Sequence, residues 1–157
     1  MSLTLSFPQF PQFTINIHKL ASVKNGQDLR AKLLAGEPTH NFAFINAQTV
    51  VSVEQLSAAI YRAILDYTGD RIRTRTLHSE CIFALSPTQN IVDALKRYGI
   101  QDDSEDLIVV KVIEDGKDDP AYDLSVVEGE EVTVSDEELQ KTANIALIKK
   151  VSKGTMK

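Results

Sequence analysis

Apolar and polar residues along this chain repeat with two periods, one typical of strands and one typical of helices. Apolar residues at 13, 15 and 17 alternate with polar ones, which predicts a strand over residues 13–17 after an extended lead-in at residues 7–11. Short apolar runs at residues 42–45, 80–85 and 107–113 predict three further strands, the last of them rich in valine.

Two helices are predicted in the first half of the chain. In the clearer one, Ser52 and Gln55 form a capping box, and apolar residues then fall on one helical face as far as Tyr67. The other begins after Asn25, a capping residue, and ends before Gly36.

Two shorter helices are predicted in the second half. Helical spacing over residues 91–98 ends at Gly99, which we expect in the left-handed conformation, with Ile100 completing a hydrophobic contact beyond it. Ser135 and Glu138 form a second capping box that begins a last helix. The inward residues expected on this last helix are Leu139, Ala143, Ala146 and Leu147.

The acidic segment 114–131 predicts a loop with a short helical piece near residues 124–127. Strands and helices otherwise alternate without internal repeats or a linker. The pattern therefore predicts one α/β (α+β) domain over residues 1–157, with a mixed β-sheet flanked by helices.

Composition agrees with such a domain and excludes several classes of protein. The 157 residues are enough for one hydrophobic core. No apolar run is long enough to span a membrane, and the start of the sequence has no secretion signal, so no membrane partner is expected. The single cysteine, Cys81, cannot form an internal disulfide, which fits a reducing compartment.

The net charge of −5 is unevenly distributed along the chain. Residues 1–92 contain eight Lys/Arg and six Asp/Glu, whereas residues 93–157 contain nine and sixteen. The first part fits a local contact with a polyanion. The alternative is that the acidic part simply keeps the protein soluble, as a solvated face.

The sequence contains no recognisable catalytic constellation. It lacks a glycine-rich phosphate loop, a serine nucleophile elbow and a zinc-protease helix. Cys81 lies in a strand-like pattern and is interpreted as a small buried hydrophobic residue. These features predict a protein that is not an enzyme and uses no cofactor.

No metal site is predicted either. The histidines lie far apart, without metal-ligand spacing, and are assigned structural or surface roles. They are His18, His40 and His78. The acidic pairs 102–103 and 118–119 lack the spacing and glycine of a calcium loop, so we interpret them as solvated loops.

Arg71, Arg73 and Arg75 alternate with uncharged residues. In extended backbone, residues two apart project to the same side, so the three guanidiniums would point one way. Guanidinium binds phosphate in a bidentate manner and stacks on bases, as single-stranded RNA recognition requires. The alternative is that the arginines are solvated and pair with nearby acids such as Asp66 and Asp70.

A long ordered pattern of short motifs carries a resemblance to a known family. The motifs are Arg73-Thr74-Arg75-Thr76-Leu77, Ser79-Glu80, Leu85-Ser86-Pro87, Asn90-Ile91, Ala94-Leu95 and Gly99-Ile100-Gln101-Asp102-Asp103, preceded by Phe7-Pro8, Val23-Lys24-Asn25 and Leu29-Arg30. Over about residues 7–151 the chain resembles the TPRKB family, the small kinase-binding subunit of the KEOPS (EKC) complex.

This resemblance implies a non-catalytic subunit of the cytoplasm and nucleus. Members bind the N-lobe of the small atypical kinase/ATPase of KEOPS and modulate it. The complex, which is also linked to telomeres and transcription, installs threonylcarbamoyl on the adenosine beside the anticodon of tRNA, with a transferase subunit that carries its own metal. Archaeal relatives hold the single-stranded 3′ end of the tRNA.

The resemblance directs the candidate residues to two surfaces. The candidates for tRNA phosphates are Arg71, Arg73 and Arg75. The candidates for the kinase surface are Lys96 and Arg97 in the 91–98 helix and Ile145 and Ile148 in the final helix. For the isoleucines the alternative is the intramolecular core, and for the whole chain it is a stand-alone RNA-binding module.

The resemblance also carries an expectation for the C-terminus. The family pattern continues after Leu-Ile-Lys-Lys with another apolar helix, whereas this sequence runs through residues 151–157 without one. If that helix helps to bind the kinase or closes the core, we expect weaker kinase binding and an uncovered apolar groove that favours self-association.

Overall fold

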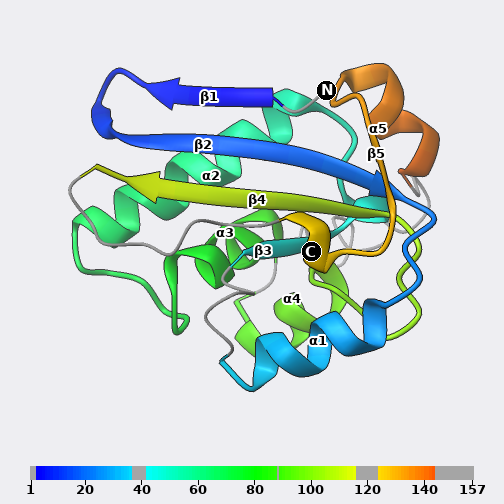
Figure 1. Ribbon diagram of the computed structural model, residues 1–157. Coiled ribbons are helices and arrows are strands. Elements are labelled where there is room, and N and C mark those ends of the chain that lie inside the picture. Colours follow the sequence, from blue (N-terminus) through cyan, green and yellow to red (C-terminus); the bar gives the residue numbers. More distant parts are fainter. Residues whose placement is uncertain (1–2, 37–41, 88, 116–123, 144–157) are drawn as a thin grey trace.

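A computed structural model describes residues 3–36, 42–87, 89–115 and 124–143. Figure 1 shows one twisted sheet with helices packed against it. Within the described residues the prediction of a single α/β (α+β) domain with a sheet flanked by helices is confirmed. The sheet was expected to be mixed, but its described strands pair only antiparallel.

The five-stranded sheet has the order β1-β2-β4-β3, with β5 also beside β2, and all pairings among the described strands are antiparallel. The strands are β1 (Leu3–Phe7), β2 (Phe10–Ala21), β3 (Ala43–Asn46), β4 (Leu107–Glu114) and β5 (Glu130–Val132). β1 and β5 pair with different parts of the same edge of the long strand β2. β1 is therefore the outermost strand along most of that edge of the sheet.

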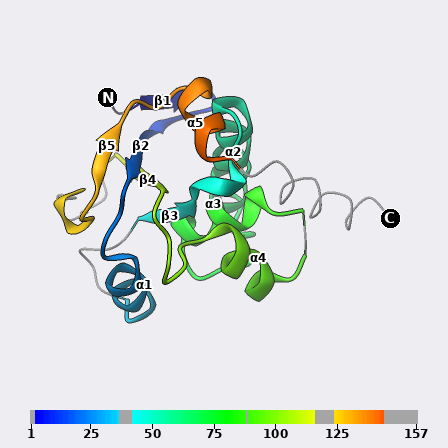
Figure 2. The ribbon, with the colours of Figure 1, turned by 90° about the vertical axis from the view of Figure 1, so that its right-hand side faces the viewer.

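The helices lie on both faces of this sheet. They are α1 (Gly26–Leu34), α2 (Val53–Thr68), α3 (Leu77–Leu85), α4 (Ile91–Tyr98) and α5 (Asp136–Thr142), with 3₁₀ turns at Ala47–Thr49 and Leu124–Val126. Figure 2 shows α2, α3 and α4 on one side of the sheet and α1 away from them. None of the helices in the described ranges is long and apolar enough to cross a membrane.

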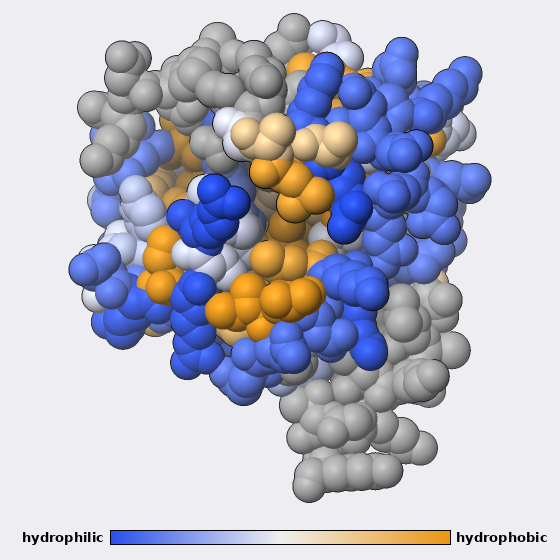
Figure 3. All heavy atoms as spheres, turned by 90° about the horizontal axis from the view of Figure 1, so that it is seen from below, coloured by the Kyte–Doolittle hydropathy of each residue, from blue (hydrophilic) through white to orange (hydrophobic). Residues whose placement is uncertain are grey.

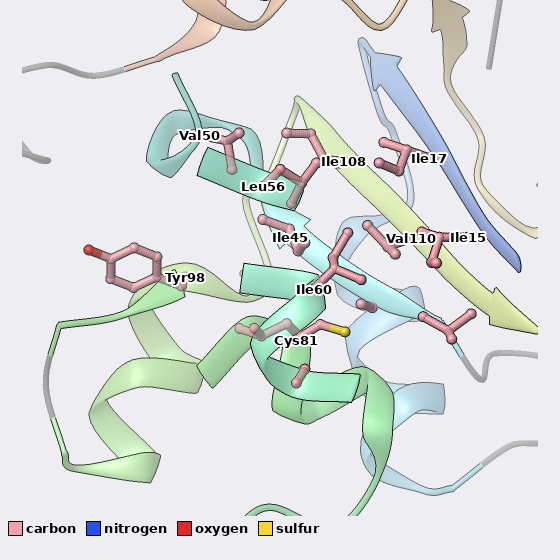
Figure 4. Packing of buried hydrophobic residues seen from close by; sticks show 14 of the residues in the cluster. Ile15, Ile17, Ile45, Val50, Leu56, Ile60, Cys81, Tyr98, Ile108 and Val110 are labelled. Atoms are coloured by element: carbon pink, nitrogen blue, oxygen red, sulfur yellow. The ribbon is translucent and has the colours of Figure 1, made fainter. Parts of the chain in front are cut away.

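The larger core cluster fills the space between the sheet and α2, α3 and α4. Its side chains include Ile15, Ile17, Ile45, Leu56, Ile60, Cys81, Tyr98, Ile108 and Val110, most of them fully buried (Figure 4). The alternate residues of the same strands point to the other face. There Leu20, Phe44 and Val109 join Leu29 of α1 in a second cluster.

Most of the predicted elements are confirmed. The strands predicted at residues 13–17, 42–45 and 107–113 correspond to parts of β2, β3 and β4. The proposed lead-in at residues 7–11 instead contains the turn between β1 and β2. Neither β1 nor β5 was predicted. The three residues of β5 are largely acidic and lie in a segment assigned to a loop.

The prediction of a strand at residues 80–85 is wrong, because this segment belongs to helix α3. Its residues are apolar on nearly every side because α3 lies among α2, α4 and the sheet. A short helix buried all round has no amphipathic period, so its apolar run looks like that of a buried strand.

The expected left-handed conformation of Gly99 is also wrong. Its φ of −88° and ψ of −176° are extended, and Gly99 forms a bridge with Ile45 of β3. Glycine is needed here for space, because a Cβ atom would lie 2.5 Å from the carbonyl oxygen of Leu95. Ile100 is buried in the second cluster.

The predicted helix starts are confirmed, with differences in the capping contacts. Ser52 Oγ accepts from the Gln55 N–H at 3.0 Å, but Gln55 Oε1 accepts from the N–H of Val51 rather than of Ser52. Ser135 Oγ accepts from the Glu138 N–H at 3.2 Å.

Helices α1 and α5 differ from expectation at one end each. The Asn25 side chain makes no capping bond and instead bridges to Val126 and Glu128. Helix α5 ends at Thr142 with Ala143 as its C-cap, so Ala143 does not continue the helix. Ala146 and Leu147 were also expected to face inward on this helix, and both lie outside the described residues.

Candidate partner and RNA surfaces

The loop between α2 and α3, residues 69–76, holds the three candidate arginines and is called the arginine loop below. A buried carboxylate fixes its shape. Glu80, on the first turn of α3, is 2% exposed. Its Oε1 atom accepts hydrogen bonds from the backbone N–H groups of Arg73 and Thr74 at 3.0 and 3.1 Å and from the Thr74 hydroxyl at 2.8 Å. The backbone of this loop is therefore tied to the helix.

The arginines project from this loop as their spacing predicts. Arg71, Arg73 and Arg75 are exposed, whereas the intervening Ile72 and Thr74 are half-buried. The three arginine side chains are therefore on the solvent side of the loop, although its backbone bends at residues 74–76 and is not a continuous extended segment.

The three arginines differ in their contacts. Arg71 Nε lies 3.6 Å from an Asp66 carboxylate oxygen, one of the pairs expected in the alternative interpretation. Arg73 lies over the Phe83 ring at 6.0 Å and donates to the Gln89 side chain. Arg75 has no ion pair within the described part of the chain. Arg73 and Arg75 are thus the members without a carboxylate partner there.

The arginine contacts bring in residues that sequence reasoning missed. Glu80 and Phe83 were assigned to a strand, which separated them from the arginine loop. The available signal was Thr76 followed by Ser79, a capping pair that starts a helix and places Glu80 on its first turn.

Helix α4 presents a polar outer side with one apolar residue. Ala94 and Tyr98 face the core, whereas Lys96 and Arg97 are exposed. Arg97 Nε forms an ion pair with an Asp93 oxygen at 3.0 Å, and Val92 is 77% exposed. Figure 3, seen from the side of α1 and α4, shows apolar surface enclosed by hydrophilic residues. The other candidates for the kinase surface, Ile145 and Ile148, lie outside the described residues.

The candidate reactive groups have structural contacts. His78 Nε2 accepts from the backbone N–H of Val112 at 3.0 Å, beyond the point where β3 stops pairing with β4. His18 Nδ1 lies 2.9 Å from a Glu131 oxygen, which links β2 to β5. Burial raises the pKa of the Cys81 thiol to about 12, so this cysteine is protonated at neutral pH.

Among the described residues no group of three His, Cys, Asp or Glu side chains is placed to hold a metal ion. Asp102 lies 3.4 Å from Arg30 in an exposed ion pair. His40 and the acidic pair 118–119 lie outside the described residues.

Comparison with known proteins identifies the family. The family model described as "Kinase binding protein CGI-121" matches residues 20–155. A protein of Kluyveromyces lactis named "EKC/KEOPS complex subunit CGI121" is 48% identical over 95% of this chain and 92% of its own length. Proteins with the same name from Yarrowia lipolytica and Schizosaccharomyces pombe are 41% and 31% identical, over 95% and 91% of this chain and 84% and 83% of their own lengths. This chain belongs to the CGI-121 family of kinase binding proteins.

Proposed function

We propose that this chain is a non-catalytic subunit of an EKC/KEOPS complex that binds the small atypical kinase/ATPase and supports threonylcarbamoyladenosine modification of tRNA. The observation that carries this proposal is the similarity along nearly the whole chain to relatives named as EKC/KEOPS subunits. The threonylcarbamoyl transferase subunit would be an indirect partner. Action in the cytoplasm and nucleus is part of the same proposal.

The outer side of α4 is the proposed kinase surface. Val92 is an apolar side chain left in water, with the exposed Lys96 and Arg97 on the same short helix. Docking patches have an apolar centre and a polar rim, and Val92 with its charged neighbours fits that arrangement on a small scale. The proximity of α4 to the arginine loop, through Arg73 and Gln89, would let one partner contact both.

Co-purification with the kinase subunit and measurement of its ATP turnover test this surface. Val92→Glu should weaken association about tenfold or more, because it places a charge at the centre of the patch. The matched control is Leu34→Glu on α1, where the apolar side chain is 64% exposed. A wild-type chain that neither binds the kinase nor changes its turnover would contradict the proposed function, and equal effects of the two substitutions would contradict the surface.

The arginine loop is the proposed site for the single-stranded 3′ end of tRNA. The hydrogen bonds to Glu80 hold its backbone before any ligand arrives, which lowers the entropic cost of binding. Arg73 and Arg75 offer guanidiniums without a carboxylate partner in the described residues, and phosphate matches their geometry.

Binding of intact tRNA, compared with tRNA lacking its 3′ single-stranded tail, tests this second site. We expect tight binding only with the tail, and loss of that difference in a double variant with Arg73→Glu and Arg75→Glu. Unchanged affinity in the double variant would rule out the arginine loop.

The second candidate function, a stand-alone RNA-binding module, rests on the same exposed arginines. It predicts tail-dependent tRNA binding by a chain that does not associate with the kinase. Measuring both interactions on one preparation separates the two functions.

A further inference from the structure

A shallow, largely apolar groove of about 510 Å³ lies along the outer side of α2, beside the end of β1. Phe7 of β1 lines one side, and α2 contributes Glu54, Ala58, Tyr61, Arg62 and Leu65. Leu65 is 40% exposed, and the Phe7 and Tyr61 rings meet edge to face at 5.3 Å. The groove is remote in sequence from α4, but it ends close to the arginine loop, since Arg71 Nη2 donates to the Leu65 carbonyl oxygen at 3.4 Å.

The strand next to this groove has an unprotected edge. In the described residues β1 pairs only with β2, so its other edge leaves backbone N–H and C=O groups unpaired. Edge strands are normally guarded by charged residues or proline within the strand. β1 has neither, and no charged side chain precedes His18 in the sequence. Such an edge is available to another strand.

The strand edge and the groove lie side by side. β1 and α2 run in the same direction (Figure 1), and the contact between Phe7 and Tyr61 aligns them. A strand rises roughly 3.3 Å and a helix roughly 1.5 Å per residue, so Leu5, the middle of β1, is nearly level with Ala58. One partner can therefore meet both features at once.

The charges along the groove are arranged symmetrically about Ala58. Glu54 lies four residues before Ala58 and Arg62 four residues after it, and all three side chains are exposed. Residues at this spacing follow one another along the same side of a helix. A two-fold axis through Ala58 would place Glu54 of one copy against Arg62 of the other, twice.

We propose that the β1 edge and the α2 groove form the contact surface for a second copy of this chain, paired about a two-fold axis. Antiparallel pairing of two β1 strands about Leu5 would join the two sheets, and the two α2 helices would pack antiparallel beneath them. A surface that is complementary to itself is what an isologous dimer requires. The small side chain of Ala58 lets the two helices approach closely.

Charge reversal tests this pairing directly. The dissociation constant of the full chain would be measured by sedimentation over a concentration series. Arg62→Glu and Glu54→Arg each create two like-charged contacts per dimer, so each should weaken the dimer about tenfold or more. The double variant restores opposite charges and should recover wild-type association. Lys32→Glu, on the exposed side of α1, is the matched control.

A cysteine on the axis gives a second, independent measurement. In Ala58→Cys the new thiols of the two copies would lie next to each other and form a covalent dimer on mild oxidation. Cys81 is fully buried and does not interfere. Leu34→Cys, at a 64% exposed position on α1, should cross-link much more slowly. Circular dichroism verifies that each variant is folded.

Three results would overturn the proposal. The first is a wild-type chain that stays monomeric over the whole concentration series. The second is a dimer that the single charge reversals leave intact, or that the double variant fails to restore. The third is equal cross-linking of Ala58→Cys and Leu34→Cys. A monomeric chain whose kinase binding is lost in Arg62→Glu would assign the surface to that partner instead. The three overturning results do not depend on tRNA or kinase binding by the wild-type chain.

Discussion

Glu80 shows how one buried side chain determines the shape of a surface loop. Its carboxylate is almost completely excluded from solvent, and one oxygen accepts all three hydrogen bonds from Arg73 and Thr74. The loop has no regular secondary structure, so these bonds satisfy backbone donors that a strand or helix would otherwise pair.

Removal of the Glu80 acceptor should destabilise the protein. Glu80→Ala leaves three donors without their partner and should lower the free energy of unfolding by about 2 kcal/mol. Glu80→Gln keeps a carbonyl oxygen and should cost less. Urea denaturation of the two variants measures the difference. Equal stability of Glu80→Ala and wild type would show that water replaces the carboxylate without cost.

Cys81 provides a pH-dependent prediction. The folded state keeps the thiol protonated up to a pKa of about 12, against 9.0 for the ordinary group. The unfolded chain therefore binds fewer protons above pH 9.0, and the free energy of unfolding should fall as pH rises, by up to about 1.4 kcal/mol per pH unit. Below that pH the contribution is constant.

Two measurements check this behaviour. The loss of stability between about pH 9 and about pH 11 should be smaller in Cys81→Ala than in the wild type, because the variant lacks the thiol. Ellman's reagent should react with Cys81 slowly in the native protein and rapidly in denaturant. A rapid native reaction would contradict the burial that raises the pKa.

Single residues were predictable from the sequence where the local pattern determines exposure. The alternation around Arg73 and the burial of Cys81 are of this kind, because neighbouring residues alone suffice to indicate them. The need for glycine at position 99 could not be predicted from neighbouring residues, because it arises from a carbonyl oxygen of α4 that lies where a Cβ atom would be. The contact between Glu80 and Thr74 depended on knowing that α3 is a helix.

At the scale of elements, amphipathic segments were predicted and the fully buried one was not. Helices α2 and α4 each have a solvent-facing side, and their period is visible in the sequence. In α3 the buried residues surround the helix, and only the polar residues at its start indicate its type. The capping pair Thr76 and Ser79 was the informative signal, since Ser79 replaces the usual Glu or Gln of a capping box.

The start of α3 can be tested through this pair. Thr76 Oγ1 accepts from the Ser79 N–H at 3.1 Å, and Ser79 Oγ accepts from the Thr76 N–H at 3.0 Å. Thr76→Ala should destabilise the protein by about 1 kcal/mol, whereas Thr76→Asp, which keeps a capping acceptor, should be close to wild type. Thermal or urea denaturation gives both values. A harmless Thr76→Ala would mean that the arginine loop holds α3 without its cap.

At the scale of the whole molecule, the proposed contact surfaces lie on different parts of the fold. The arginine loop lies near the start of α4, through the contact of Arg73 with Gln89. β1 is at one end of the strand order and β3 at the other. The sheet order itself was not predicted, because it depends on pairing between β2 and β4, which are more than 80 residues apart. Local periodicity carries no information about such partners.

The net charge of −5 means that the proposed tRNA binding would have to rest on local contacts and not on overall attraction. If three arginines each neutralise one phosphate of a single strand, the logarithm of the binding constant should fall with the logarithm of salt concentration with a slope of about −2. Replacing Arg73 and Arg75 by Gln should reduce the slope to about −0.7, since one phosphate contact remains. The matched control replaces Arg30 and Lys32 on α1 by Gln, which removes the same charge and should leave the slope unchanged. Fluorescence anisotropy titrations over a salt series measure all three slopes. Equal slopes in the two double variants would mean that the protein's total charge, and not the arginine loop, determines RNA binding.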